Sequence, residues 1–312
     1  MPCSTSIEEA VEMAEVRWSG YEFRIEGHAA HGLCPICGKA TEDGFTIFSD
    51  GGFWCRPGGC KGWIDDDQQN TWTPEELRLR KIEAEIKRLA RQQEDHERRL
   101  SALERLNKSR VHERYHNALD EEAYLWWMKK GCEPWVVQDY HLGVCDRCPT
   151  DQEHRRSYTI PLFDQGQSQL LNLRHRIADA QNGDKYRPEM AGLGTCLAFS
   201  HHLIDADMGI IVEGEIKAMV CGAYKFPTVG VFGKRGRFKA AWLDSFPKDK
   251  PIYVGLDPDA TESAERLAHG IARAGKEVYV VDWADKPDDL LVLDGCTVDE
   301  WMAHIHLARR VH

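Results

Sequence analysis

Residues 209–214 read GIIVEG and residues 251–257 read PIYVGLD, two short apolar runs that each lead into an acidic residue. PTVGVFG at 227–233 and EVYVVDW at 277–283 are runs of the same kind, and a helical stretch follows each of the first three runs in chain order. Alternation of Val- and Ile-rich runs with helices predicts a largely parallel sheet covered by helices. We therefore expect an α/β fold for this part of the chain.

Acidic side chains follow two of these predicted strands. Glu213 comes directly after one run, and Asp257 and Asp259 come directly after another. The carboxyl ends of parallel strands meet at one edge of a sheet, so the three carboxylates are expected to converge. Each acid alone would be compatible with a turn or a helix cap. Together they predict a Mg²⁺ site that assists phosphoryl transfer.

Four cysteines near the N-terminus have the spacing of a zinc site. Cys34 and Cys37 form a C-x2-C pair, and Cys55 and Cys60 form a C-x4-C pair after seventeen intervening residues. Two close pairs on tight turns suit a tetrahedral Zn²⁺, and the intervening segment has the β-rich character of a zinc ribbon. Four thiolates close the coordination shell, so we expect His31 to lie near the zinc without binding it. A closed shell also means that the zinc is structural.

Aromatic and basic residues accompany this predicted ribbon: Phe45, Phe48, Phe53, Trp54 and Trp63 with Lys39, Arg56 and Lys61. Aromatic side chains beside cations suit single-stranded nucleic acid, because bases stack on rings while cations contact phosphates. The alternative is that most of these aromatic residues form the small core of the ribbon itself.

A further pair, Cys145 and Cys148, has no matching pair in the sequence. Cys132 and His154 are the nearby residues that could complete a second metal site. Free thiols in a loop are the favoured interpretation.

A helix start is marked at Thr73 and Pro74, and no Gly or Pro follows from Leu77 to about His116. We expect one long helix of roughly forty residues, which would be roughly 60 Å long. Its apolar residues lie three and four apart, but the polar Gln93 and His96 interrupt the series. A solvated connector or hairpin is favoured over a dimerising coiled coil, which needs a cleaner heptad repeat.

Composition limits the class of protein. The chain has 312 residues with 42% hydrophobic and 29% charged content, as expected of globular domains. No apolar run approaches the roughly 18 residues of a membrane span, and the N-terminus has no features of a secretory signal. We expect a cytoplasmic protein without membrane contact, whose eleven cysteines are thiols and metal ligands. The net charge of −11 argues against a protein that coats nucleic acid generically.

Three motifs in the C-terminal part resemble a known domain. IIVEGEIKAMV at 210–220, VGLDPDA at 254–260 and KPDDLL at 286–291 occur in the order and spacing of the TOPRIM domain. Upstream, residues 124–144 resemble the helical entry to the polymerase core of DnaG-type primases, and residues 159–188 resemble the small N-terminal subdomain of that core. With a ribbon at the amino end, the chain resembles a DnaG-type or bacteriophage primase.

The resemblance implies roles for individual residues. Glu213 matches the invariant TOPRIM glutamate, Asp257 and Asp259 match its D-x-D, and Asp288 matches the second acid of its D-P-D. Three further residues match basic positions that line the template and nucleotide groove: Arg174, Arg176 and Lys185. Solvent-exposed charge is the alternative interpretation of those three.

Two positions depart from the family pattern. Lys217 and Lys286 stand where these primases usually carry acids, which puts the full metal set in doubt. Residues 233–237, GKRGR, lack the frame of a phosphate-binding P-loop, and we expect Lys234 and Arg235 to contact phosphate or template.

The resemblance implies synthesis of short RNA primers from NTPs on a single-stranded DNA template, with structural Zn²⁺ and catalytic Mg²⁺ or Mn²⁺. A replicative helicase would act in trans, in the host cytoplasm if a phage or mobile element encodes the chain. A TOPRIM nuclease and a catalytically reduced zinc-ribbon DNA-binding replication factor are the alternatives. The expected domains are a ribbon at 1–70, a helical linker at 71–118, the N-terminal core subdomain at 119–205 and the TOPRIM subdomain at 206–312.

Overall fold

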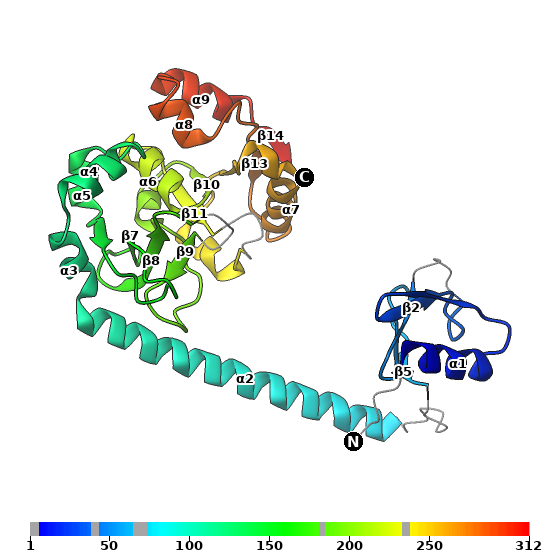
Figure 1. Ribbon diagram of the computed structural model, residues 1–312. Coiled ribbons are helices and arrows are strands. Elements are labelled where there is room, and N and C mark those ends of the chain that lie inside the picture. Colours follow the sequence, from blue (N-terminus) through cyan, green and yellow to red (C-terminus); the bar gives the residue numbers. More distant parts are fainter. Residues whose placement is uncertain (1–5, 39–43, 65–73, 181–184, 233–237, 312) are drawn as a thin grey trace. The chain divides into compact units, whose positions relative to one another are not determined.

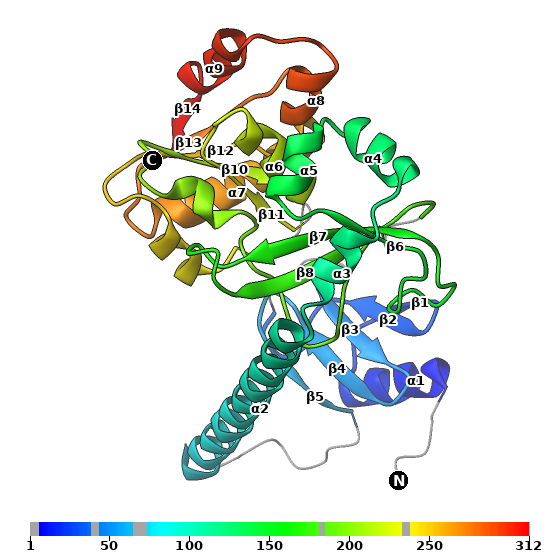
Figure 2. The same ribbon diagram turned by 90° about the vertical axis from the view of Figure 1, so that its left-hand side faces the viewer.

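The computed structural model describes residues 6–38, 44–64, 74–180, 185–232 and 238–311 (Figures 1 and 2). Contacts between Cα atoms divide the chain into two compact units, Met1–Leu89 and Ala90–His312. Each unit has a hydrophobic core of its own.

The N-terminal unit is an antiparallel five-stranded sheet with one helix packed on it. Its strands lie in chain order, β1 (Phe23–Glu26), β2 (Ala29–Gly32), β3 (Phe45–Phe48), β4 (Gly52–Cys55) and β5 (Lys61–Trp63). Helix α1 (Ile7–Arg17) begins with a capping box between Ser6 and Glu9. Its buried face packs on the sheet, so the predicted ribbon has a small but continuous core.

The predicted long helix is shorter than expected at its C-terminal end. Helix α2 runs from Pro74 to Ser109, and α3 (Val111–Asn117) follows after Arg110, which has the left-handed φ of 47°. Leu106 and Val111, on either side of this break, are both buried in the same cluster. Among the described residues, neither α2 nor any other helix combines the length and apolar character that crossing a membrane requires.

In the C-terminal unit, two short helices and an antiparallel sheet follow α3. Helices α4 (Glu121–Met128) and α5 (Pro134–Asp139) precede four strands in the order β6-β7-β8-β9. The strands are β6 (Gly143–Cys145), β7 (Ser157–Phe163), β8 (Leu170–Ile177) and β9 (Tyr186–Pro188). Side chains alternate along β8, so Arg174 and Arg176 share one face and His175 points to the other.

The second sheet has the order β11-β10-β12-β13-β14. Its first four strands pair in parallel, and β14 is antiparallel. The strands are β10 (Gly209–Glu213), β11 (Thr228–Val231), β12 (Ile252–Val254), β13 (Val278–Val280) and β14 (Arg309–Val311). The remaining helices are α6 (Glu215–Ala223), α7 (Thr261–Ala272), α8 (Pro287–Val292) and α9 (Val298–His306), with 3-10 turns η1 (Ser200–Leu203), η2 (Ala240–Ser245) and η3 (Pro258–Ala260).

Both faces of the parallel sheet are covered. On strand β10, Ile210 and Val212 belong to the core that includes α6 and α9, whereas Ile211 belongs to the core that includes α7. The four Val- and Ile-rich runs of the sequence form the four parallel strands. The predicted α/β fold with a largely parallel sheet is therefore confirmed.

Candidate metal and nucleotide site

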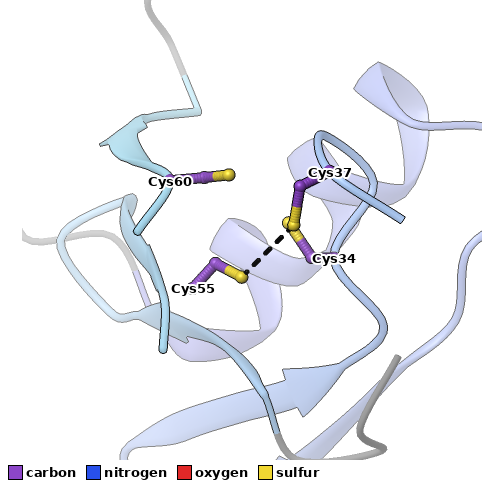
Figure 3. Close-up of side chains that lie close together, drawn as sticks. All are labelled: Cys34, Cys37, Cys55 and Cys60. Atoms are coloured by element: carbon purple, nitrogen blue, oxygen red, sulfur yellow. Dashed lines mark hydrogen bonds between the residues drawn. The ribbon is translucent and has the colours of Figure 1, made fainter. Parts of the chain in front are cut away.

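The four predicted zinc ligands lie together in the N-terminal unit (Figure 3). The sulfur atoms of Cys34, Cys37, Cys55 and Cys60 are all within 4.8 Å of one another. This cluster fits one tetrahedral structural zinc ion. His31 is outside the group, and its Nδ1 lies 3.2 Å from Thr46 Oγ1.

Burial shifts the pKa values of two thiols in this cluster upwards. Burial raises the pKa of Cys34 to about 12, and burial also raises the pKa of Cys60. Thiols in this environment stay protonated unless a metal compensates the charge of the thiolates. Four sulfurs held at this spacing are the donor set that zinc prefers.

Gly58 leaves the space that the sulfur cluster needs. A Cβ atom at this position would lie 2.4 Å from Cys37 Sγ and 3.2 Å from Cys55 Sγ. We expect Gly58→Ala to weaken zinc binding, because the methyl group displaces a ligand. Competition with a chromogenic chelator measures this. Gly38→Ala is the control because, among the described residues other than its chain neighbours, no atom lies within 4 Å of its added Cβ, although its positive φ adds strain. Equal zinc retention in both variants would contradict the expectation.

The aromatic residues of the ribbon divide into two groups. Phe45 and Phe53 are buried, whereas Phe48, Trp54 and Trp63 are exposed by 43%, 46% and 48%. The alternative that most of them form the core is therefore wrong. Trp54 and Lys61 are partners across β4 and β5, which puts a ring beside a cation on an exposed face. Arg56 is also exposed, and Lys39 lies outside the described residues.

Three of the predicted catalytic acids follow adjacent parallel strands. Glu213 ends β10, Asp257 precedes η3 after β12, and Asp288 lies in the first turn of α8 after β13. These strands are neighbours in the order β10-β12-β13, so the three residues lie at the carboxyl edge of one sheet. The sequence predicted that Glu213, Asp257 and Asp259 converge, and the strand order puts the first two of them at this edge. Asp259, on η3, is exposed.

A cleft of about 440 Å³ lies beside this edge of the sheet. Its acidic lining residues are Glu213, Asp288 and Asp289, and its basic ones are Lys129, Lys130, Arg176, Lys185, Lys217 and Lys286. Such a mixture of carboxylates and cations suits a ligand that carries several phosphate groups and a divalent metal. Lys234 and Arg235 lie outside the described residues.

Both departures from the family pattern lie in ion pairs. Lys217 Nζ is 3.3 Å from Asp257 Oδ1, and Lys286 Nζ is 3.3 Å from Asp289 Oδ2. Burial raises the pKa of Asp288, and the positive charge of Lys217 opposes that rise. The buried Oδ1 of Asp288 has no hydrogen-bond partner among the described residues.

The three predicted basic residues have different surroundings. Arg176 and Lys185 line the cleft, and the Arg176 guanidinium lies 5.6 Å from the Trp126 ring and 5.4 Å from the Tyr186 ring. Arg174 Nε is instead 2.8 Å from Glu215 Oε1, and both side chains are mostly buried. This contact joins β8 to the start of α6, two residues after Glu213.

Glu215 is a residue that the sequence did not single out. We expect Glu215→Gln to lower the free energy of unfolding by about 3 kcal/mol, because it leaves a buried guanidinium without its counter-charge. Denaturant unfolding followed by circular dichroism measures the change. Glu265→Gln is the matched control, since Glu265 pairs with Arg309 at 2.7 Å on the surface and surface pairs contribute little. Equal losses in the two variants would contradict a special contribution of the buried pair.

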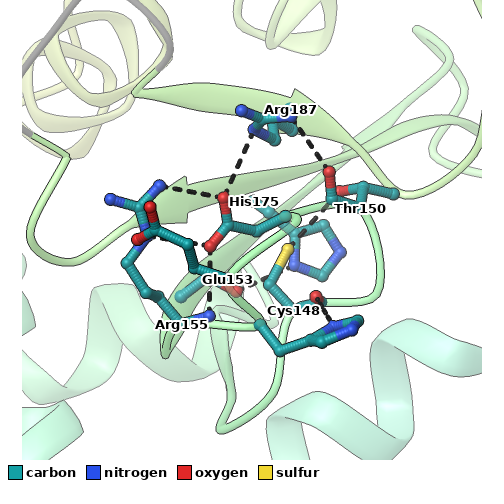
Figure 4. A network of polar contacts seen from close by, with 9 residues as sticks. Cys148, Thr150, Glu153, Arg155, His175 and Arg187 are labelled. Atoms are coloured by element: carbon teal, nitrogen blue, oxygen red, sulfur yellow. Dashed lines mark hydrogen bonds and ion pairs between the residues drawn. The ribbon is translucent and has the colours of Figure 1, made fainter.

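Cys145 and Cys148 are both buried, and Cys148 lies in a polar network with Thr150 and His175 (Figure 4). Burial opposes protonation of His175, yet its contacts with Cys145, Cys148 and Glu189 raise its pKa to about 11. Burial alone would raise the pKa of Cys148, but the contact with His175 lowers that pKa to about 6. Next to them, Asp151 Oδ2 accepts a 2.8 Å hydrogen bond from Arg155 Nε.

This network differs from the second metal site considered from the sequence. Within the described part of the chain, Cys145 and Cys148 belong to no group of three close metal-binding side chains. Cys132 is buried in another cluster, and His154 contacts the backbone oxygen of Cys148 through Nδ1. Free thiols are the interpretation that the structure supports, although both are buried.

Comparisons with known proteins support the fold. No protein-family model matches the chain, and no curated protein sequence matches it. The structure is similar to the zinc-binding and RNA polymerase domains of the Aquifex aeolicus primase, at 17% identity and a TM-score of 0.53, over 99% of this chain and 87% of that chain. A DnaG catalytic core is similar at 13% identity and a TM-score of 0.52, over 67% and 80% of the two chains.

The catalytic domain of a DnaG primase bound to single-stranded DNA is also similar. Its identity is 14% and its TM-score 0.51, over 70% of this chain and 80% of that chain. The chain therefore has the fold of the zinc-binding and RNA polymerase domains of DnaG primases. The fold that the sequence resemblance implied is confirmed.

Proposed function

We propose that this chain is a primase, a nucleotidyltransferase that makes short RNA primers from NTPs on single-stranded DNA. One observation carries the proposal: Glu213, Asp257 and Asp288 follow three adjacent parallel strands, beside a cleft lined by cations. Carboxylates that hold a divalent metal, next to cations that bind phosphates, are what nucleotidyl transfer requires. We assign this chemistry to a TOPRIM-type catalytic subdomain at residues 206–312.

Bound Mg²⁺ or Mn²⁺ would supply charge compensation for the attacking and leaving oxygens, with Glu213, Asp257 and Asp259 as its ligands. Glu213 is positioned by the end of an interior strand, so its carboxylate has a defined place relative to the cleft. Arg176 and Lys185 line the same cleft and would bind the triphosphate or the template strand. Asp288 would support the metal ligands from the first turn of α8.

We assign template contact to the zinc-binding unit. The exposed Trp54 ring lies beside Lys61, so a base can stack on the ring while the cation contacts a phosphate. Single-stranded DNA of any sequence can bind in this way. The zinc would hold the fold of this unit and take no part in the reaction. We further propose a cytoplasmic protein, phage- or mobile-element-encoded, that works with a replicative helicase in trans.

One assay distinguishes the proposed function from the two alternatives. Purified full-length protein is incubated with single-stranded DNA, labelled NTPs and Mg²⁺ or Mn²⁺. A primase makes short RNA products, and their formation depends on the template. A TOPRIM nuclease shortens the DNA, and a non-catalytic replication factor binds DNA without either product. Cleaved DNA or unchanged nucleotides in every metal condition would refute the proposal.

A further inference from the structure

A lysine lies among the carboxylates of the candidate site. Lys217 is on α6, four residues after Glu213, and its Nζ is 3.3 Å from Asp257 Oδ1. The two side chains are only 17% and 13% exposed, so solvent screens this pair less than a surface pair. The ammonium therefore acts as a fixed positive charge at the carboxyl edge of the sheet.

A second carboxylate shares the surroundings of this ammonium. Lys217 and Asp288 line the same cleft as Glu213. Lys217 thus brings positive charge next to carboxylates that follow two different strands, β12 and β13, which is also what a metal ion in this place would do.

We propose that the Lys217 ammonium replaces one divalent cation, so that this carboxylate group binds a single Mg²⁺ or Mn²⁺ ion. The inference rests on the proposed function in assigning a metal to these residues. A fixed charge a few ångströms away repels an incoming divalent ion, and the ammonium already forms an ion pair with Asp257 Oδ1 at 3.3 Å. Lysine suits this position because its charge is a compact point charge with three donors.

Lys286 provides a matched control. It lines the same cleft, but its side chain is 50% exposed, and its ammonium pairs with Asp289, which is not one of the three acids. Solvent and that partner screen its charge, so its removal should change metal binding less. Lys217→Met removes the charge and keeps the aliphatic stem of the side chain, whereas Lys217→Arg keeps the charge.

The test is a Mn²⁺ titration of the zinc-loaded full-length protein, followed by calorimetry and by the electron paramagnetic resonance of free Mn²⁺, without DNA or nucleotide. We expect one bound Mn²⁺ in the wild type and in Lys217→Arg. Lys217→Met should gain a second Mn²⁺ or bind the first at least about tenfold more tightly, a change of about 1.4 kcal/mol. The Lys286→Met variant should shift the titration by less. Matching thermal unfolding curves establish that each variant is folded.

Two results would overturn this inference: two Mn²⁺ ions in the wild type, or identical titrations of wild type and Lys217→Met. The experiment needs no primer synthesis, so its failure is separate from a failure of the proposed function. If the protein makes no primers while Lys217→Met gains Mn²⁺ affinity, the primase proposal falls and the role of Lys217 stands.

Discussion

Glu213→Gln should abolish nucleotide addition by the purified protein, with a loss of at least about 100-fold. The substitution keeps the size of the side chain and removes the charge that a metal ligand needs. Binding to single-stranded DNA should stay nearly unchanged, because the basic residues of the cleft are intact. Extension of labelled NTPs on a DNA template and fluorescence anisotropy of labelled DNA measure the two properties.

The control for this variant is Glu262→Gln, the same change at a side chain that is 91% exposed on α7. Asp257→Asn should also inactivate the protein, but it leaves the Lys217 ammonium without its carboxylate partner, so two effects are combined. Glu213→Gln is therefore the cleaner experiment. Synthesis at the wild-type rate in Glu213→Gln would show that the catalytic site has been assigned wrongly.

Cys37→Ser should unfold the N-terminal unit. A structural zinc ion contributes on the order of 10 kcal/mol to the folding of a small domain, and the core of this unit is small. Serine is a poor zinc ligand at neutral pH, so the zinc content should fall from one ion per chain towards none. Atomic absorption gives the zinc content, and limited proteolysis with mass spectrometry locates the unfolded segment.

Cys296→Ser is the control, since Cys296 is partly exposed in the C-terminal unit and outside the sulfur cluster. The C-terminal unit should remain folded in both variants, because its cores do not include the ribbon residues. A Cys37→Ser protein that keeps one zinc and resists proteolysis like the wild type would refute the four-cysteine site.

The parts of the fold that the sequence predicted depend on local patterns. The parallel strands follow from Val- and Ile-rich runs, and the sulfur cluster follows from the spacing of two cysteine pairs. In both cases the residues that predict the structure lie close together in the sequence. The antiparallel strand β14, Arg309–Val311, was not predicted, because three residues with two arginines have no strand pattern.

The Arg-His-Arg triplet at 174–176 shows how far the roles of site residues can be predicted from the sequence. The alternation of a strand puts the two arginines on one face, yet Arg174 pairs with the buried Glu215 and Arg176 lines the cleft. That difference depends on where α6 approaches β8, forty-one residues away in the chain. Likewise, Lys217 is recognised in the sequence as a departure, but its contact with Asp257 requires the strand order of the sheet.

The candidate site combines residues with different protection against local opening: Glu213 on the interior strand β10 and Asp259 on the exposed turn η3. This strand pairs on both sides, and its two faces are buried in different cores, so its amide hydrogens should exchange only when the whole unit unfolds. Asp259, on a short exposed 3-10 turn, has no such protection against local opening. We therefore expect the amide hydrogens around η3 to exchange faster than those of β10, and a metal ion that binds both Glu213 and Asp259 would slow exchange around η3 and leave β10 unchanged.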